Sequence, residues 1–133
     1  MTWSDVHART LILETVLERA RREPGYGLRL DGLGDVERLF GGTGGVLLAL
    51  QHRWSTHLAV KLDFAVEAGA SAQAAWDELA AEQPTLRAVL DAHSRRSLRL
   101  RGARRSEQLM IAEHVAGGQL YGDPQLHITK TIA

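Results

Sequence analysis

The sequence predicts an all-α fold, a compact bundle of four or five helices around one long central helix, with a small two-stranded β appendage. Apolar residues recur at spacings of three and four along most of the 133 residues, which is the helical period. Gly and Pro divide this pattern into segments of helical length. Only two short stretches alternate with the period of two that indicates strands. A chain of this length can bury one core, so we expect residues 1–133 to form a single helical domain.

The composition is typical of a globular protein and excludes several kinds of chemistry. Hydrophobic residues make up 44% and charged residues 24% of the chain, and no apolar run reaches the roughly 18 residues of a membrane helix. The absence of cysteine excludes disulfides, thiol nucleophiles and Cys-ligated metals. The N-terminus lacks the features of a signal peptide, so we expect a cytoplasmic protein. Fourteen Arg against two Lys, with no Asn, indicate a GC-rich bacterial genome.

The first helix is predicted over residues 4–22. Ser4 is placed to cap it, and Asp5 lies at the positive end of the helix dipole. The sequence Glu23-Pro24-Gly25 ends it, because the residue before a proline avoids the helical conformation. Its apolar stripe consists of Val6, Leu13, Val16, Leu17 and Ala20.

A glycine-rich connection is expected over residues 25–45, which hold eight of the thirteen glycines. The alternation from Tyr26 to Leu30 indicates a short strand. Asp35 to Phe40 fits one or two helical turns. We therefore expect this stretch to link two helices without a core of its own.

The central helix is predicted over residues 44–68, with Thr43 as its cap and Gly69 as its stop. A third helix begins after Ser71 and is kinked or restarted at Gln83-Pro84. Ser106 is placed to cap a last helix that Gly117-Gly118 would end. The apolar stripe of the central helix comprises Leu47, Leu50, Trp54, Leu58, Leu62 and Ala65, widened by Val46, Val60 and Phe64. The residues expected to pack against it are Leu13, Leu17, Trp76, Leu79, Leu86 and Leu90.

The C-terminal tail, residues 117–133, changes period again. Residues 125–132 alternate apolar and polar side chains and are rich in β-branched types, which indicates a strand. A single strand is not stable alone. We expect it to pair with residues 26–30, within one chain or across a dimer.

No motif for catalysis or cofactor binding is found in the sequence. The glycines lack the spacing of a phosphate-binding loop or a dinucleotide fingerprint, and no nucleophile elbow is present. His52 and His57 lie about 140° apart around a helix, so one ion could not bind both. We therefore expect no catalytic residues, no metal and no cofactor. The side chains of Trp54, His57, Lys61 and Trp76 are predicted to line a pocket between helices.

Charge is distributed unevenly although the chain is neutral overall. Residues 67–93 carry a net charge of minus four and residues 94–105 a net charge of plus six. Such a basic segment suits an anionic partner or the acidic surface of a second copy. No aromatic residue lies between Trp76 and Tyr121, which favours protein contact over nucleic acid. The predicted partner-binding residues are Arg95, Arg96, Arg99, Arg101, Arg104 and Arg105.

Residues 39–49, with the sequence LFGGTGGVLLA, resemble the junction after the recognition helix of TetR-type repressors. In that family, Phe-Gly-Ser-Lys-Glu-x-Leu-Leu leads into a long helix. Here Thr43 replaces the lysine and Gly44 the acid. The resemblance implies DNA binding, with a helix-turn-helix between the first helix and the central one.

The sequence thus predicts a non-enzymatic helical binding or regulatory module that acts through protein–protein contacts as a homodimer. Nucleic-acid binding, through the TetR-like junction or the Arg segment, is the first alternative. A helical sensor that binds a small molecule in an apolar pocket is the second.

Overall fold

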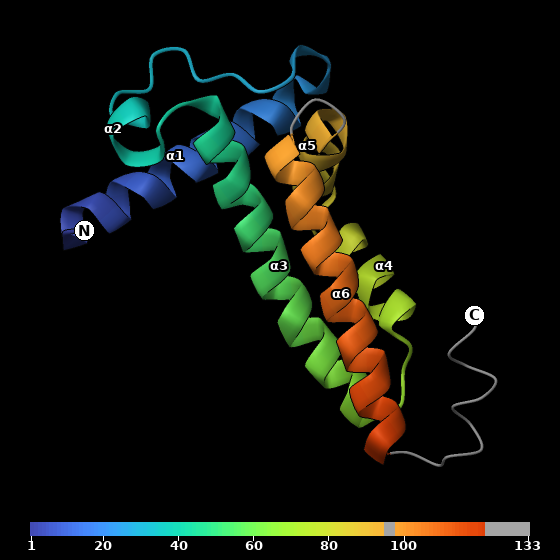
Figure 1. The fold of residues 1–133 in the computed structure, drawn as a ribbon. Helices are drawn as coiled ribbons and strands as arrows, with labels where there is room; N and C mark the ends of the chain where they lie inside the picture. The colour runs from blue at the N-terminus through green and yellow to red at the C-terminus, as the bar shows by residue number, and fades with distance from the viewer. Residues whose placement is uncertain (95–97, 122–133) are drawn as a thin grey trace. The chain divides into compact units, whose positions relative to one another are not determined.

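The computed structural model describes residues 1–94 and 98–121, and side chains within these ranges except at 26, 98–101 and 115–121. The described residues form α-helices and one 3-10 turn and contain no strand, which confirms the all-α prediction (Figure 1). The elements in chain order are α1 (Trp3–Arg22), η1 (Pro24–Tyr26), α2 (Val36–Phe40), α3 (Thr43–Ala68), α4 (Ala72–Glu82), α5 (Pro84–Ser94) and α6 (Leu98–Tyr121).

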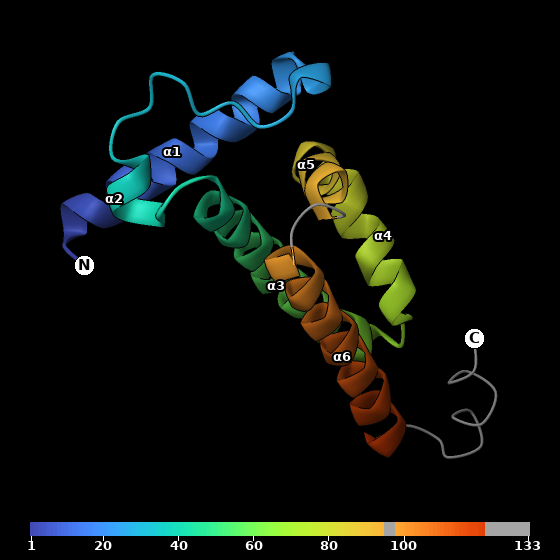
Figure 2. The ribbon, with the colours of Figure 1, turned by 45° about the horizontal axis from the view of Figure 1, so that its top comes forward.

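Contacts within the chain group these elements into two compact units. Unit 1 contains residues 1–54 and 83–103, and unit 2 contains residues 55–82 and α6 from Arg104 onward. The long helix α3 continues from one unit into the other. In unit 1, α2, η1 and α5 all contact α1 (Figures 1 and 2).

The start of α1 is fixed by a capping box rather than by the predicted cap at Ser4. The hydroxyl of Thr2 accepts a hydrogen bond from the backbone amide of Asp5 at 3.1 Å, and the Asp5 carboxylate accepts one from the Thr2 amide. Arg38 of α2 also donates to Asp5 at 2.8 Å. These hydrogen bonds lower the pKa of Asp5, with the one from Arg38 contributing most. One carboxylate therefore caps α1 and ties α2 to it.

The predicted core residues are mostly buried. Leu17 and Trp76 are half-buried, so these two expectations were only partly right. Trp54 is fully buried, and the buried guanidinium of Arg87 lies over its ring at 4.6 Å. Val6, Val60 and Phe64 were expected on apolar stripes facing the core and are instead exposed. The buried members of the predicted set are Leu13, Leu47, Leu50, Trp54, Leu58, Leu62, Leu79, Leu86 and Leu90, together with Val16, Ala20, Val46 and Ala65.

The junction between α2 and α3 depends on close backbone packing. Gly41 has a φ of 74°, a conformation that favours glycine, and ends α2. A Cβ atom on Gly45 would overlap the carbonyl oxygen of Phe40 and lie 2.6 Å from its carbonyl carbon. Arg9 of α1 covers the Phe40 ring at 4.3 Å. The helix begins at Thr43 itself, one residue earlier than predicted.

The predicted strand from Tyr26 to Leu30 does not form. Instead η1 occupies its first residue, and the chain then follows an irregular path in which Gly27 has a φ of 69°. The guanidinium of Arg19 donates to the carbonyl oxygens of Arg29 and Asp31 at 3.3 and 2.7 Å. The Arg19 side chain thus takes the hydrogen bonds that these carbonyl oxygens would accept from a neighbouring strand. The predicted partner strand, residues 125–132, lies outside the described residues.

Helix boundaries after α3 follow the predicted signals in part. Gly69 has a φ of 72° and ends α3, and Ser71 accepts a hydrogen bond from the Ala74 amide at 3.0 Å at the start of α4. Pro84 begins α5. The last helix, however, starts at Leu98 and passes through Ser106, so the predicted cap there is wrong. It also continues through Gly117-Gly118 to Tyr121 rather than ending at that pair.

Candidate functional site

The two long helices of unit 2 lie side by side and run in the same direction (Figures 1 and 2). The imidazole Nε2 of His114 on α6 lies 2.8 Å from a carboxylate oxygen of Asp63 on α3. The other ring nitrogen lies 3.0 Å from the carbonyl oxygen of Met110. Burial opposes the charged imidazole, but these two hydrogen bonds outweigh it and raise the pKa of His114. This contact fixes which residues of α3 and α6 are neighbours.

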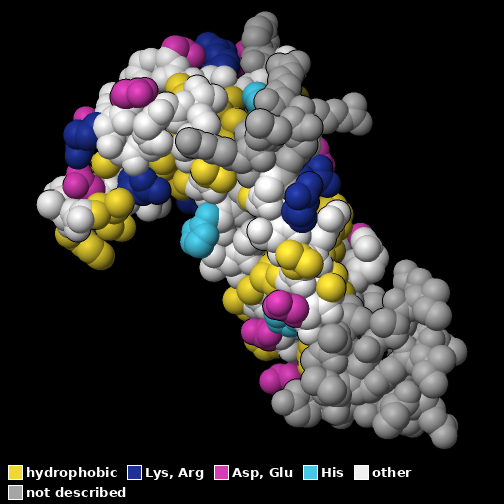
Figure 3. All heavy atoms as spheres, viewed as in Figure 1, with side chains coloured by type: hydrophobic (Ala, Val, Ile, Leu, Met, Phe, Trp, Pro, Cys, Tyr) yellow, Lys and Arg dark blue, Asp and Glu magenta, His cyan; other side chains and the backbone are white. Residues whose placement is uncertain are grey.

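Four large apolar side chains in the described parts of these helices are exposed: Val66 is 41% accessible, and the other three are more than half accessible. Val60 is 52%, Phe64 66% and Leu109 61% accessible to solvent. Val60 and Phe64 are each two residues beyond a buried leucine of α3, which turns them about 200° away from the core. Figure 3 shows hydrophobic side chains gathered over α3 and α6. We call Val60, Phe64 and Leu109 the apolar face.

The contact between Asp63 and His114 places this face on one side of the helix pair. Because the helices run in the same direction, Phe64, one residue after Asp63, and Glu113, one residue before His114, point to the same side. Leu109 lies one helical turn before Glu113. The apolar side chains of α3 and α6 therefore belong to one surface.

Exposed acidic groups border the apolar face, and Figure 3 shows acidic side chains beside it. Asp63, Glu67 and Glu113 are all exposed. Arg105, one turn before Leu109 on α6, is also exposed. The surface is therefore apolar at its centre, with acidic groups toward the C-terminal end of α6 and a basic group toward its N-terminal end.

The predicted pocket residues occupy different environments. Trp54, in unit 1, is fully buried, and His57, in unit 2, is exposed. Lys61 donates to Glu78 at 2.7 Å and also to Glu82, and these hydrogen bonds, the one to Glu78 foremost, raise its pKa.

A polar contact joins α4 and α6 in unit 2. Trp76, the fourth predicted pocket residue, is half-buried, and its indole Nε1 donates to the buried carboxylate of Glu107 at 3.2 Å. The ammonium group of Lys61 and the indole N–H of Trp76, which the sequence had suggested for a ligand, thus form contacts between helices of unit 2.

The predicted arginine cluster is only partly described by the structure. Arg95 and Arg96 lie outside the described residues, and Arg99 and Arg101 lie on α6 without described side chains. Arg104 is half-buried and Arg105 is exposed. Within this cluster, Arg105 is therefore the residue whose described side chain is available to a partner.

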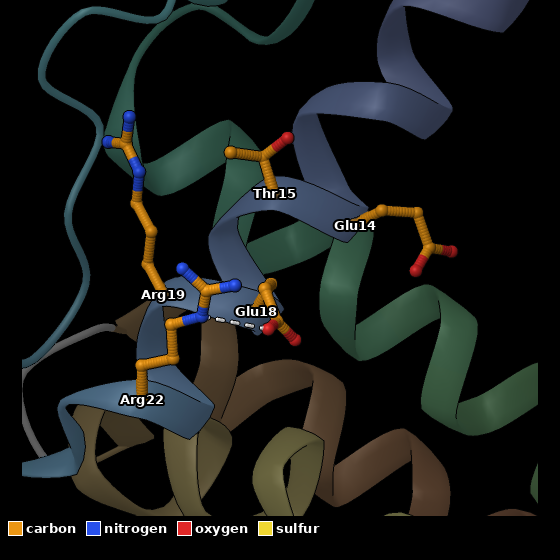
Figure 4. Close-up of a pocket in the computed structure, with 5 residues that line it drawn as sticks. All are labelled: Glu14, Thr15, Glu18, Arg19 and Arg22. Atoms are coloured by element: carbon orange, nitrogen blue, oxygen red, sulfur yellow. Dashed lines mark hydrogen bonds and ion pairs between the residues drawn. The ribbon is translucent and has the colours of Figure 1, made fainter.

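The clefts described in unit 1 include a charged one on α1 and a smaller apolar one beside α5, and neither of these contains a predicted pocket residue. A charged cleft of about 400 Å³ on α1 is lined by Glu14, Thr15, Glu18, Arg19 and Arg22 (Figure 4). In it, Glu18 accepts a hydrogen bond from Arg22 at 3.0 Å, and a stronger one from Arg21 lowers the pKa of Glu18 to about 2.

The second cleft lies between the end of α1, η1 and α5 and has a volume of about 260 Å³. It is lined mainly by small apolar residues, with His93, Arg21 and Thr85 as its polar groups. Ligand pockets commonly measure about 300–1,000 Å³, so this cleft is small for one.

None of the described helices combines the length and apolarity required to cross a membrane. Among the described side chains, no cluster of three or more His, Asp or Glu residues is arranged to hold a metal ion. Comparisons with protein-family models, curated proteins and solved structures found no match for this chain.

Proposed function

We propose that this protein is a non-enzymatic helical binding module that acts through protein–protein contacts as a homodimer. The observation that carries the proposal is the apolar face of unit 2, where Val60, Phe64 and Leu109 are all more than half exposed. Exposed apolar surface bordered by polar residues is typical of protein interaction sites. The high ratio of Arg to Lys favours a bacterial source, and we propose a cytoplasmic setting.

Energetics support a role for this face beyond the fold. Full burial of a Leu, Val or Phe side chain stabilises by about 1.5–3 kcal/mol, so covering each half-exposed side chain would contribute about 1 kcal/mol. Mutual contact between two copies counts each side chain twice. The three side chains of each copy would thus contribute about 6 kcal/mol toward the roughly 4–15 kcal/mol that lost translational and rotational freedom costs on association.

The other two functions have less support from the described residues. A helix-turn-helix places a recognition helix in the major groove, but the connection between α1 and α3 contains only η1 and the five-residue α2. A small-molecule sensor needs an enclosed apolar pocket, and the apolar cleft of unit 1 is only about 260 Å³. Protein contact is therefore the function that we put forward.

Sedimentation velocity over a concentration series tests the proposal. We expect the unmodified chain to sediment as a dimer and Phe64→Ser to shift the equilibrium toward monomer. Leu11→Ser is the matched control, because Leu11 is 68% exposed on α1, outside the apolar face. Circular dichroism would verify that both variants keep their helical content. A chain that stays monomeric at every concentration would refute the homodimer.

A further inference from the structure

One stripe of α6 combines a basic, an apolar and an acidic side chain at equal spacing. Arg105, Leu109 and Glu113 are four residues apart, so they follow one another along the same side of the helix. All three are exposed, and Leu109 is 61% accessible. Adjacent members are separated by about 6 Å along the helix axis. We call these residues the α6 stripe.

The charged ends of this stripe have no ion pair among the described residues. The described salt bridges of unit 2 involve Lys61 with Glu78 and Glu82, and His114 with Asp63. Neither Arg105 nor Glu113 takes part in one. Within the described part of the chain, their charges are therefore not committed to a salt bridge, although the charge of Glu113 also acts on the neighbouring His114.

The order of the side chains determines which partner would complement them. If a second copy of the stripe runs in the opposite direction, Leu109 faces Leu109 and each Arg105 faces a Glu113. If the second copy runs in the same direction, like charges meet at both ends. A two-fold axis relates the halves of most homodimers, and an axis perpendicular to α6 produces the opposed arrangement, in which opposite charges meet. The stripe is therefore complementary to itself.

Neighbouring residues extend the same surface. Phe64 of α3 points to the side on which Glu113 lies, as the contact between Asp63 and His114 requires. Val60 lies one turn before Phe64 on α3. In an opposed pair these apolar side chains would widen the contact around Leu109, and the two Arg–Glu pairs would lie at its edges, where charges set orientation more than affinity.

We propose that two copies of this protein associate through the α6 stripe, antiparallel about a two-fold axis beside Leu109. Arg105 of each copy pairs with Glu113 of the other, and the two Leu109 side chains pack together. This inference rests on the proposed homodimer and adds its interface, orientation and charge pairing.

Charge reversal tests the pairing by sedimentation velocity. Arg105→Glu and Glu113→Arg each place like charges at both edges, so we expect each variant alone to dimerise about tenfold or more weakly. The variant carrying both changes restores opposite charges and should dimerise like the unmodified chain. Arg22→Glu, a change of the same charge at an exposed arginine of unit 1, is the control and should leave the dimer unchanged.

Mixing the two single variants tests whether charges of the α6 stripe meet across the contact. In a mixed dimer, the carboxylate introduced by Arg105→Glu faces the guanidinium introduced by Glu113→Arg at one edge. At the other edge, the native Arg105 of one variant faces the native Glu113 of the other. We expect the mixture to form heterodimers although each variant alone is largely monomeric. Two monomeric variants that stay monomeric when mixed would refute the antiparallel pairing.

A cysteine crosslink tests the position of the axis. The chain has no cysteine, so Leu109→Cys introduces a single thiol. We expect mild oxidation to link two copies of this variant rapidly, and Gln108→Cys, an exposed position one residue away, to link them more slowly. If the unmodified chain dimerises but neither charge reversal nor the crosslink follows this pattern, the homodimer stands and the α6 stripe is not its interface.

Discussion

Two neighbouring glycines at the start of α3 should respond oppositely to the same substitution. A Cβ atom on Gly44 meets nothing within 4 Å, whereas one on Gly45 would overlap the backbone of Phe40. Replacing glycine by alanine inside a helix stabilises by about 0.5–1 kcal/mol, which is the gain expected for Gly44→Ala. At Gly45 the overlapping atoms belong to the backbone and cannot rotate away. Overpacking costs about 1–3 kcal/mol, and an overlap with backbone atoms belongs at the upper end of that range, so after subtraction of the helical gain we expect a net loss of about 2 kcal/mol for Gly45→Ala.

Urea denaturation, followed by circular dichroism, measures both changes. With a slope of about 2 kcal/mol per molar urea, Gly45→Ala should lower the unfolding midpoint by about 1 M, while Gly44→Ala raises it slightly. The two variants have the same composition and change adjacent positions of one helix, so the main difference between them is the local contact. If Gly45→Ala is as stable as Gly44→Ala, the backbone of Phe40 does not lie as close to Gly45 as the structure places it.

Two other predictions concern unit 2. Leu58 is fully buried, so Leu58→Ala should lower the free energy of unfolding by about 2–5 kcal/mol. Val60 is half-exposed, so Val60→Ala should lower it by less than about 1 kcal/mol. Equal urea midpoints for the two variants would show that the buried side of α3 is misassigned. The pKa of His114 is raised in the folded state, so its pairing with Asp63 stabilises the fold below the ordinary His pKa of about 6.5 and loses that contribution as the pH rises through the folded pKa. Asp63→Asn should reduce this pH dependence of the urea midpoint, and an unchanged dependence would assign it to another group.

The sequence predicts the helices well where periodicity and chain breakers agree. Gly69 and Pro84 mark real boundaries because a positive φ and a missing amide act locally. Gly102 and Ser106 also resemble breakers, yet α6 passes through both. A glycine inside a helix costs only about 1 kcal/mol, which packing elsewhere along a long helix can offset. Local signals therefore fail where their cost is smaller than the stabilisation from tertiary contacts.

The loop after α1 shows a different limit of sequence reasoning. The alternation from Tyr26 to Leu30 has the period of a strand, but the sequence does not reveal that Arg19 reaches the carbonyl groups of Arg29 and Asp31. The contact joins residues ten and twelve positions apart. A side chain that occupies backbone acceptors cannot be inferred from periodicity.

The apolar face can be recognised in the sequence as a second apolar repeat on α3, shifted from the one that faces the core. The residues of α3 that precede Leu58 and Leu62 at spacings of four, back to Val46, are buried, whereas Val60 and Phe64 repeat with each other on the opposite side. When Val60 and Phe64 are assigned to the core stripe, this exposed repeat is not recognised. Two apolar repeats shifted by two residues on one helix indicate two separate faces: one packs in the core, and the other is the face that we propose contacts a partner.

This separation determines how the interface can be tested without unfolding the protein. Leu58 lies in the core of unit 2, so its substitution changes stability and association together. Arg105, Leu109 and Glu113 are exposed, and neither charged end of the stripe forms an ion pair within the described part of the chain. Exposed positions of this kind usually change stability by less than about 0.5 kcal/mol when substituted. A charge reversal that dissociates the dimer while the urea midpoint of the monomer stays constant therefore reports on the contact between copies and not on the fold.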